Sequence, residues 1–263
     1  MLRVASWGCG LQSTTMIAMS ALGELEPLDA VIHCDLGWER QATMESRRWY
    51  TDWLAYRGVL VLILDVGDIR QLGSTEHIHM PFWTQDGGHL RRQCTRHFKI
   101  RPMRQRVRQL LGYDPSVPPA PPPGSVEQWI GISLDEWQRA DESRVQYIHN
   151  RYPLLQHDMT REDCARWLEE HDLPVPIKSA CVGCPFRKAS EWLEMRESTP
   201  GEWAEAVAFD EQIRHHKLDR VTAGELYVYK HRAPLTEADL EADAAREMQT
   251  SAYQIPMAFK WRS

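Results

Sequence analysis

The first 66 residues alternate between two apolar patterns, and this alternation most limits what the chain can fold into. Three short apolar runs are typical of β-strands: Leu2–Ala5, Ala30–Cys34 and 59–66. The two segments between them have the spacing of amphipathic helices: Ser13–Leu22 and 41–57. This order predicts an α/β fold, an open and mainly parallel sheet with helices on both faces. The continuous apolar run 59–66 predicts a strand that is covered on both faces.

The second half of the chain predicts a mostly helical part. Three segments have helical patterns, and Thr160 is a suitable N-cap for the first of them: 161–172, 190–198 and 200–216. The proline-rich segment Asp114–Ser125 can form neither a helix nor a central strand. Because strand-like sequence resumes at 126–133, we interpret this segment as a surface insertion. We therefore expect an α/β domain at residues 1–178 and a helical C-terminal subdomain at residues 179–263.

Composition excludes several classes of protein. The chain has 263 residues, 43% of them hydrophobic, and a formal net charge of −6, so nucleic acid could be attracted only by a local basic patch. No apolar run has the length of a membrane span. Because the N-terminal pattern is not that of a signal peptide, we expect a cytoplasmic protein without a membrane partner, and its six cysteines are then not expected to form disulfides.

A turn of small residues, SWGCGLQSTT at Ser6–Thr15, connects the first strand to the first helix. Ligands of open parallel sheets bind beyond the carboxyl ends of the strands, which is where this turn lies. Its backbone N–H groups and the helix dipole favour an anion, and the hydroxyls of Ser13 and Thr14 add donors. From composition alone, an ordinary tight turn followed by an N-cap explains the residues equally well.

The same turn resembles the PP-loop of the N-type ATP pyrophosphatases, most closely the phosphoadenosine phosphosulfate reductase-like family. The typical pattern is Ser-Gly-Gly-Lys-Asp-Ser-Thr, and residues 8–14 occupy its places, with Cys9, Leu11 and Gln12 replacing a glycine, the lysine and the aspartate. The resemblance extends in order over roughly residues 1–190. It implies an adenine nucleotide alpha hydrolase-like fold that binds ATP with Mg²⁺.

The resemblance also implies which residues contact ligands. The residues expected to bind the nucleotide are Ser6, Gly8, Gly10, Gln12, Ser13, Thr14, Asp35, Gly37 and Glu39. The segment 130–144 is similar to a strand and loop that carry acidic and basic substrate contacts, which makes Asp135 and Arg139 candidate catalytic residues. Lys99 is the third candidate, because it could replace the missing lysine of the loop.

Three cysteines form a candidate metal site. Cys181 and Cys184 form a C-x-x-C pair, and a third thiolate from Cys94 would leave one position of a tetrahedral site open. The strings around these residues are similar to those of relatives that bind a 4Fe–4S cluster through three cysteines, so the resemblance implies iron–sulfur. Zinc or unliganded thiols are the alternatives.

Cys94 lies in a basic segment, residues 91–109, for which two interpretations remain. One is a solvated helix, with Arg104, Arg106 and Arg108 facing water. The other is a funnel that steers an anionic substrate toward the metal, using Arg91, Arg92, Arg96, Lys99 and Arg101. We expect both, with the residues nearest Cys94 functional and the later ones exposed.

Three functions are consistent with these residues. The first is an adenylating enzyme that cleaves ATP to AMP and pyrophosphate and uses a cluster to transfer sulfur to, or otherwise modify, a nucleotide or nucleic acid. A sulfonucleotide reductase is the second, although no cysteine follows Cys184 to act as its nucleophile. A non-catalytic module that binds nucleotide and zinc is the third. A protein that donates sulfur or electrons would be the partner of the first, and a homodimer is one option for assembly.

Overall fold

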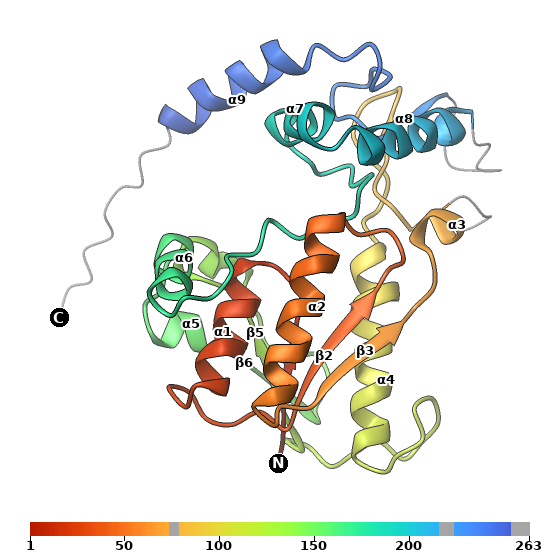
Figure 1. The fold of residues 1–263 in the computed structure, drawn as a ribbon. Helices are drawn as coiled ribbons and strands as arrows, with labels where there is room; N and C mark the ends of the chain where they lie inside the picture. Colours follow the sequence, from red (N-terminus) through yellow and green to blue (C-terminus); the bar gives the residue numbers. More distant parts are fainter. Residues whose placement is uncertain (74–78, 216–223, 254–263) are drawn as a thin grey trace. The chain divides into compact units, whose positions relative to one another are not determined.

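The computed structural model describes residues 1–73, 79–215 and 224–253, which belong to two compact units (Figure 1). The first unit comprises Met1–Leu72 and Gln93–Cys181. The second unit comprises Gly73–Arg92 and Val182–Ser263. The larger segment of the second unit thus begins at Val182, close to the expected boundary at residue 179. The second unit also includes residues 73–92, which the sequence analysis had placed in the first domain.

The first unit contains a five-stranded sheet in the order β3-β2-β1-β5-β6. Its strands are β1 (Leu2–Ser6), β2 (Ala30–Asp35), β3 (Val61–Asp65), β5 (Val126–Ile130) and β6 (Ile148–Arg151). All neighbouring strands are parallel, and at the carboxyl end of β1 Ser6 lies opposite Ile32 on one side and Ile130 on the other. The predicted open parallel sheet is confirmed.

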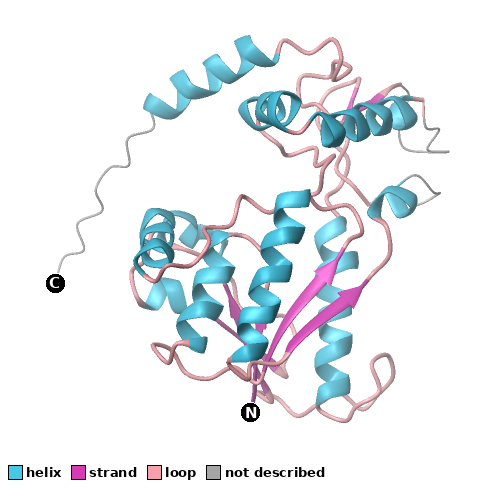
Figure 2. Ribbon diagram, in the orientation of Figure 1, coloured by secondary structure: helices cyan, strands magenta, loops and turns pink. Residues whose placement is uncertain are grey.

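Helices cover both faces of this sheet, as predicted (Figure 2). On one face four helices share a core with Ala5, Val31 and Trp129: α1 (Leu11–Ala21), α2 (Gln41–Tyr56), α5 (Pro153–Gln156) and α6 (Arg161–Glu170). On the other face, α4 (Arg101–Leu110) packs against Val4 and Ile32 through Met103 and Val107. Three short elements complete the unit: α3 (Ile69–Gly73), η1 (Arg96–Ile100) and η2 (Leu134–Arg139).

Two local predictions have different outcomes. Thr160 caps α6 with a capping box formed with Asp163, as its position predicted. The strand predicted at 59–66 exists, but the expectation that both of its faces are covered is wrong. β3 lies at the edge of the sheet, and Ile63 is 40% exposed.

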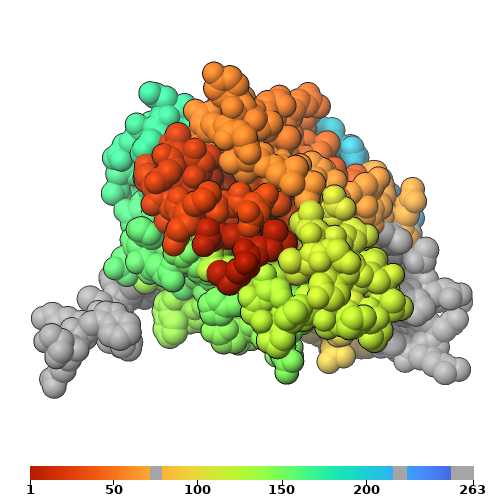
Figure 3. Space-filling view, turned by 90° about the horizontal axis from the view of Figure 1, so that it is seen from below, coloured from red at the N-terminus to blue at the C-terminus, as the bar shows by residue number. Residues whose placement is uncertain are grey.

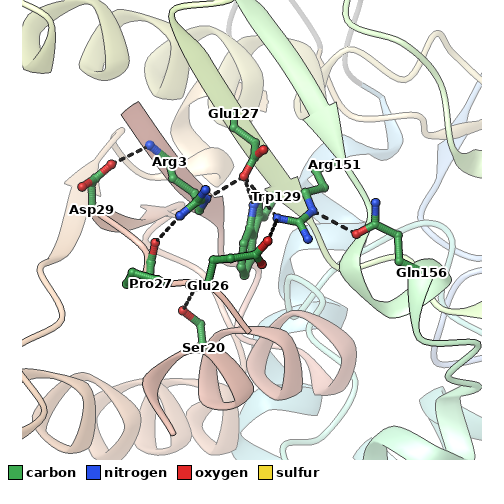
Figure 4. A network of polar contacts seen from close by, with 9 residues as sticks. All are labelled: Arg3, Ser20, Glu26, Pro27, Asp29, Glu127, Trp129, Arg151 and Gln156. Atoms are coloured by element: carbon green, nitrogen blue, oxygen red, sulfur yellow. Dashed lines mark hydrogen bonds and ion pairs between the residues drawn. The ribbon is translucent and has the colours of Figure 1, made fainter. Parts of the chain in front are cut away.

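A polar network connects three strands of the sheet, β1, β5 and β6 (Figure 4). Arg3 on β1 pairs with Glu127 on β5 at 2.6 Å, and Arg151 on β6 lies 3.5 Å from the same carboxylate. The indole of Trp129 donates to Glu127 as well. This network connects the central strands β1 and β5 to the edge strand β6.

The second unit is mostly helical, as predicted. It contains α7 (Ala189–Ser198), α8 (Pro200–Arg214) and α9 (Leu240–Tyr253), and an antiparallel pair formed by β4 (Trp83–Thr84) and β7 (Leu226–Tyr227). This pair explains why residues 73–92 fold with the C-terminal part, since β4 hydrogen-bonds to β7. Within the described ranges, no helix is long and apolar enough to cross a membrane.

Candidate nucleotide site

The turn between β1 and α1 lies where the order of the sheet reverses. From β1 the chain proceeds outward through β2 and β3, whereas β5 and β6 lie on the other side of β1. Crevices at such reversal points are the usual ligand sites of open α/β sheets. Gly10 is the N-cap of α1, no acidic residue lies in the first turn, and the first helical bond runs from the Thr14 N–H to the Gly10 carbonyl. The preceding N–H groups therefore have no carbonyl within the helix and can receive an anion.

The side chain of Ser13 stabilises the turn by two hydrogen bonds to its backbone. Its hydroxyl accepts a hydrogen bond from the Gly8 N–H at 3.3 Å and donates one to the Gly10 carbonyl at 3.2 Å. A single side chain thus connects both glycines of the turn to the first turn of α1. Ser13 shapes the turn, in addition to any contact that it makes with a ligand.

Cys9 adopts the left-handed backbone conformation, with φ of 55°. This geometry explains why a glycine is typical of the position in the PP-loops that the turn resembles. The thiol is buried and lies 3.2 Å from Nδ1 of His33, which is 2.9 Å from the Trp7 carbonyl oxygen. Burial, and then the charge of Glu39, raise the pKa of Cys9 well above its usual value. The thiol is therefore protonated and unreactive at neutral pH.

Two residues of the turn face the core, although the sequence suggested otherwise for one of them. Leu11, which replaces the lysine of the typical pattern, is 5% exposed and packs in the core. Thr14, an expected nucleotide ligand, is fully buried, and its hydroxyl accepts from the Trp7 indole at 3.0 Å. The helical period could have predicted this burial, since positions 11, 14 and 18 lie on one face of α1.

A polar cluster at the mouth of the turn is centred on Gln12. Arg161, the first residue of α6, donates from Nη1 to Gln12 Oε1 at 2.8 Å. The Gln12 amide nitrogen lies 3.4 Å from both Ser133 Oγ and Glu136 Oε2. Sequence reasoning missed Arg161, which is distant from the turn in sequence but adds a positive charge beside it.

The candidate catalytic residues Asp135 and Arg139 lie in η2, just beyond the carboxyl end of β5. Asp135 accepts hydrogen bonds from the Arg161 backbone N–H and from the Ser133 hydroxyl, so it positions the start of α6. The side chain of Arg139 is 64% exposed and pairs with Glu136. The structure therefore places both residues at the edge of the Gln12 cluster.

The expected ligands at and after the carboxyl end of β2 differ in how far their side chains are already engaged. Burial raises the pKa of Asp35, but hydrogen bonds from the Gly37 N–H and from Arg47 outweigh it and lower the pKa below its usual value. Its two oxygens are thereby engaged, at 2.9 Å from Gly37 N and 2.5 Å from Arg47 Nη1. Glu39 is buried, with Oε2 at 3.5 Å from Nε2 of His33. Gly37 has φ of 67° and marks the turn between these two carboxylates.

Lys99, in η1, lies near the turn. Its carbonyl oxygen is 3.5 Å from the Cys34 sulfur, and its charge acts against the burial that raises the pKa of Cys9 and of Cys34. A positive charge is therefore present close to the turn, although Leu11 occupies the typical place of the lysine.

The six cysteines separate into two groups by burial. Cys9, Cys34 and Cys164 are buried, and burial raises the pKa of Cys34 to about 11 and of Cys164 to about 12. The other three, which are the predicted metal ligands, are partly exposed and form no disulfide: Cys94, Cys181 and Cys184. Among the residues that the structure describes, no three His, Cys, Asp or Glu side chains form a group that could hold a metal ion, so the metal site stays a prediction.

The segment that leads to Cys181 lies against the nucleotide turn. A Cβ atom added to Gly10 would lie 3.4 Å from that of Ser179, and the backbone of Cys181 forms an antiparallel bridge with Glu39. Cys94 and Cys181 both belong to the first unit, whereas Cys184 belongs to the second.

The prediction that the later arginines of the basic segment face water is wrong. Arg104, Arg106 and Arg108 are half-buried, and Arg104 and Arg108 line a hollow of about 430 Å³ beside α4. Arg108 holds the proline-rich segment by donating to the carbonyl oxygens of Asp114, Val117 and Pro119.

Comparison with known proteins found similar folds and no close relative. No family model matches the chain, and no curated protein matches it. One solved structure with a similar fold is the phosphoadenylyl-sulfate (PAPS) reductase of Candida auris in a phosphate complex, with 14% sequence identity, a TM-score of 0.44, and coverage of 67% of this chain and 75% of that one. Another is the U34-tRNA thiolase NcsA of Methanococcus maripaludis with its [4Fe-4S] cluster, with 12% identity, a TM-score of 0.41, and coverage of 93% and 80%.

Proposed function

We propose that this protein is an adenylating enzyme that cleaves ATP to AMP and pyrophosphate in order to modify a nucleotide or nucleic acid, with sulfur transfer as the leading reaction. The observation that carries the proposal is the β1–α1 turn, a glycine-containing helix N-terminus at the reversal point of a parallel sheet. Its resemblance to a PP-loop supports ATP as the ligand. The N–H groups of the turn would hold the phosphates and stabilise negative charge on the departing pyrophosphate.

Two positive groups support polyphosphate binding in the absence of the loop lysine. Lys99 lies close enough to the turn to affect the Cys9 thiol, and Arg161 donates to Gln12 at its mouth. Charge-assisted hydrogen bonds from such groups each contribute about 1.5–3 kcal/mol. Asp35 could hold the Mg²⁺ that accompanies ATP, since its two oxygens each accept one hydrogen bond and each keeps a second lone pair.

The partly exposed cysteines support a metal centre by their chemistry. Cys94, Cys181 and Cys184 are partly exposed and form no disulfide, in contrast to the three buried cysteines, and Cys181 lies in the segment next to the nucleotide turn. A 4Fe–4S cluster held by three thiolates supplies one iron without a protein ligand, which can carry sulfide or bind substrate. A protein that supplies sulfur or electrons would be its partner.

The decisive experiment compares metal content and ATP cleavage. We expect the anaerobically purified protein to be brown, to contain iron and acid-labile sulfide, and to release pyrophosphate from ATP when RNA, DNA or a nucleotide pool is added. A colourless protein that contains zinc and releases no pyrophosphate would instead indicate the non-catalytic module. Release of sulfite from a sulfonucleotide would indicate the reductase.

The cysteine assignment is tested by paired substitutions. Cys94→Ser and Cys184→Ser are each expected to lose most of the iron and the visible absorption while they still bind ATP, because the nucleotide turn contains neither residue. Cys164→Ser is the matched control, since this thiol is buried against α1. Equal iron content in all three variants would contradict the assignment.

The two hydrogen bonds of Ser13 predict a moderate loss of ATP affinity when its hydroxyl is removed. Ser13→Ala removes the acceptor for the Gly8 N–H and the donor to the Gly10 carbonyl, so ATP affinity is expected to fall about tenfold, equivalent to ~1.4 kcal/mol. Calorimetric titration with ATP measures the change. Ser20→Ala is the control at the far end of the same helix, where the hydroxyl bonds the Glu26 carbonyl. If both variants bind ATP as tightly as the parent, Ser13 does not shape the site.

A further inference from the structure

The hollow beside α4 is lined by unneutralised positive charge. Four arginines line it: Arg96, Arg101, Arg104 and Arg108. Within the described ranges, Arg96, Arg101 and Arg104 form no ion pair. The nearby carboxylate of Asp114 accepts hydrogen bonds from the N–H groups of Ser116 and Val117, and in the described part of the chain it forms no ion pair with these arginines. In a chain whose formal net charge is −6, such a cluster is a local exception.

The arginines form a stripe along one side of α4. Arg101, Arg104 and Arg108 are spaced three and four residues apart, which places them on one helical face over about 10 Å at ~1.5 Å per residue. The proline-rich segment forms the far wall through Pro115 and Ser116, fixed in place by Arg108. In Figure 3 the yellow-green residues of this region form one continuous surface beside the N-terminal strand.

The lining favours a phosphate chain over a compact small molecule. Small-molecule pockets are mostly apolar with few polar groups, whereas this hollow has four guanidinium groups. Of the two rings that line it, Tyr147 is only 7% exposed and His97 is half-buried, so the hollow offers little surface on which a base could stack. Arg96 and Arg101 are exposed, so the stripe is open to a long ligand.

The geometry points to a binding site for the phosphodiester backbone of a nucleic acid, in which Arg96, Arg101 and Arg104 contact successive phosphates without reading sequence. This inference deepens the proposed function, on which it rests for the claim that the bound strand is the substrate. The stripe begins in η1, which carries Lys99 near the nucleotide turn, and continues along α4. A nucleic-acid strand bound along α4 would therefore extend away from the nucleotide turn. Contacts of this kind position a strand and carry no base specificity.

The test measures strand binding without ATP. Labelled 20-nucleotide RNA and DNA, each single-stranded and duplex, are titrated by fluorescence anisotropy between 50 and 200 mM salt. The variant Arg101→Ala/Arg104→Ala is expected to bind at least tenfold more weakly at 50 mM salt. For a single strand, the slope of log affinity against log salt should become shallower by about 1.4, because each lost phosphate contact removes ~0.7. The nucleic acid for which the parent and the double variant differ in affinity, RNA or DNA, is the one whose backbone the site binds.

The control variant Arg48→Ala/Arg166→Ala removes the same charge from exposed positions on α2 and α6 and should bind strands within twofold of the parent. Equal losses in the two double variants, or an unchanged salt slope, would overturn the site, as would displacement of the strand by inorganic triphosphate at the same phosphate concentration. If the parent binds strands through Arg101 and Arg104 but never cleaves ATP, the proposed function fails and the binding site stands.

Discussion

Gly131→Ala is expected to lower the affinity for ATP ~100-fold, since displacing the turn would lose two charge-assisted hydrogen bonds to phosphate at about 1.5 kcal/mol each. A Cβ atom at residue 131 would lie 2.6 Å from both Cα and N of Ser13, and 3.0 Å from the carbonyl carbon of Gln12. These are backbone atoms at the start of α1, so no side chain can rotate away. Either the end of β5 or the nucleotide turn must move.

Stability and binding should respond differently to this substitution. Overpacking of a close contact costs about 1–3 kcal/mol, so we expect a folded protein with a lower melting temperature. Calorimetric titration with ATP and a thermal melt separate the two effects. Gly201→Ala is the control, since a Cβ atom there meets nothing within 4 Å. ATP binding by Gly131→Ala at the parent's affinity would mean that the turn does not form the nucleotide site.

The close approach of Gly131 to Ser13 illustrates what the sequence could not provide. Periodicity predicted the strands and helices of the first 66 residues, and chain order predicted a parallel sheet. A single glycine after a strand gives no sign of which backbone lies next to it, because that depends on β1 and β5 being neighbours. The contact follows from strand order, which a single sequence specifies poorly.

The Gln12 cluster shows the same limit for side chains. The resemblance placed Gln12, Asp135 and Arg139 in the site, but it gave no reason to select Arg161. Arg161 reaches Gln12 because Thr160 and Asp163 fix the start of α6 and Asp135 accepts from the first N–H of that helix. Each capping residue could be identified locally, whereas their convergence on the turn depends on the packing of α6 against α1.

The edge position of β3 and the half-buried arginines of α4 have related causes. A run of apolar residues looks the same in a central strand and in an edge strand, so 59–66 suggested full burial. Arginines spaced along a helix look solvated unless another segment covers them. Here the proline-rich insertion lies beside α4 and forms a wall with it, which the sequence of neither segment indicates alone.

Arg214→Ala is expected to destabilise the second unit by about 3–5 kcal/mol, because it leaves a buried carboxylate without its cation. Asp210 is 1% exposed and accepts hydrogen bonds from Arg214 and from the N–H groups of Val228 and Leu235. Arg214 also donates to the Leu226 carbonyl and lies 4.0 Å from the ring centroid of Tyr227. The ion pair lies within α8, and the hydrogen bonds of its two side chains connect this helix to Leu226, Val228 and Leu235.

Urea denaturation followed by tryptophan fluorescence measures this loss, and Arg196→Ala is the control in the same unit. Arg196 on α7 pairs with Glu241, whose side chain is 62% exposed, so water screens the pair and its removal should change stability little. Both variants lose one arginine and one ion pair, but only Arg214→Ala leaves a buried carboxylate unpaired and also loses the contacts to Leu226 and Tyr227. Equal losses of stability would show that the pair between Asp210 and Arg214 does not hold the unit together. ATP affinity should be unchanged in both variants, because every residue of the nucleotide turn belongs to the first unit.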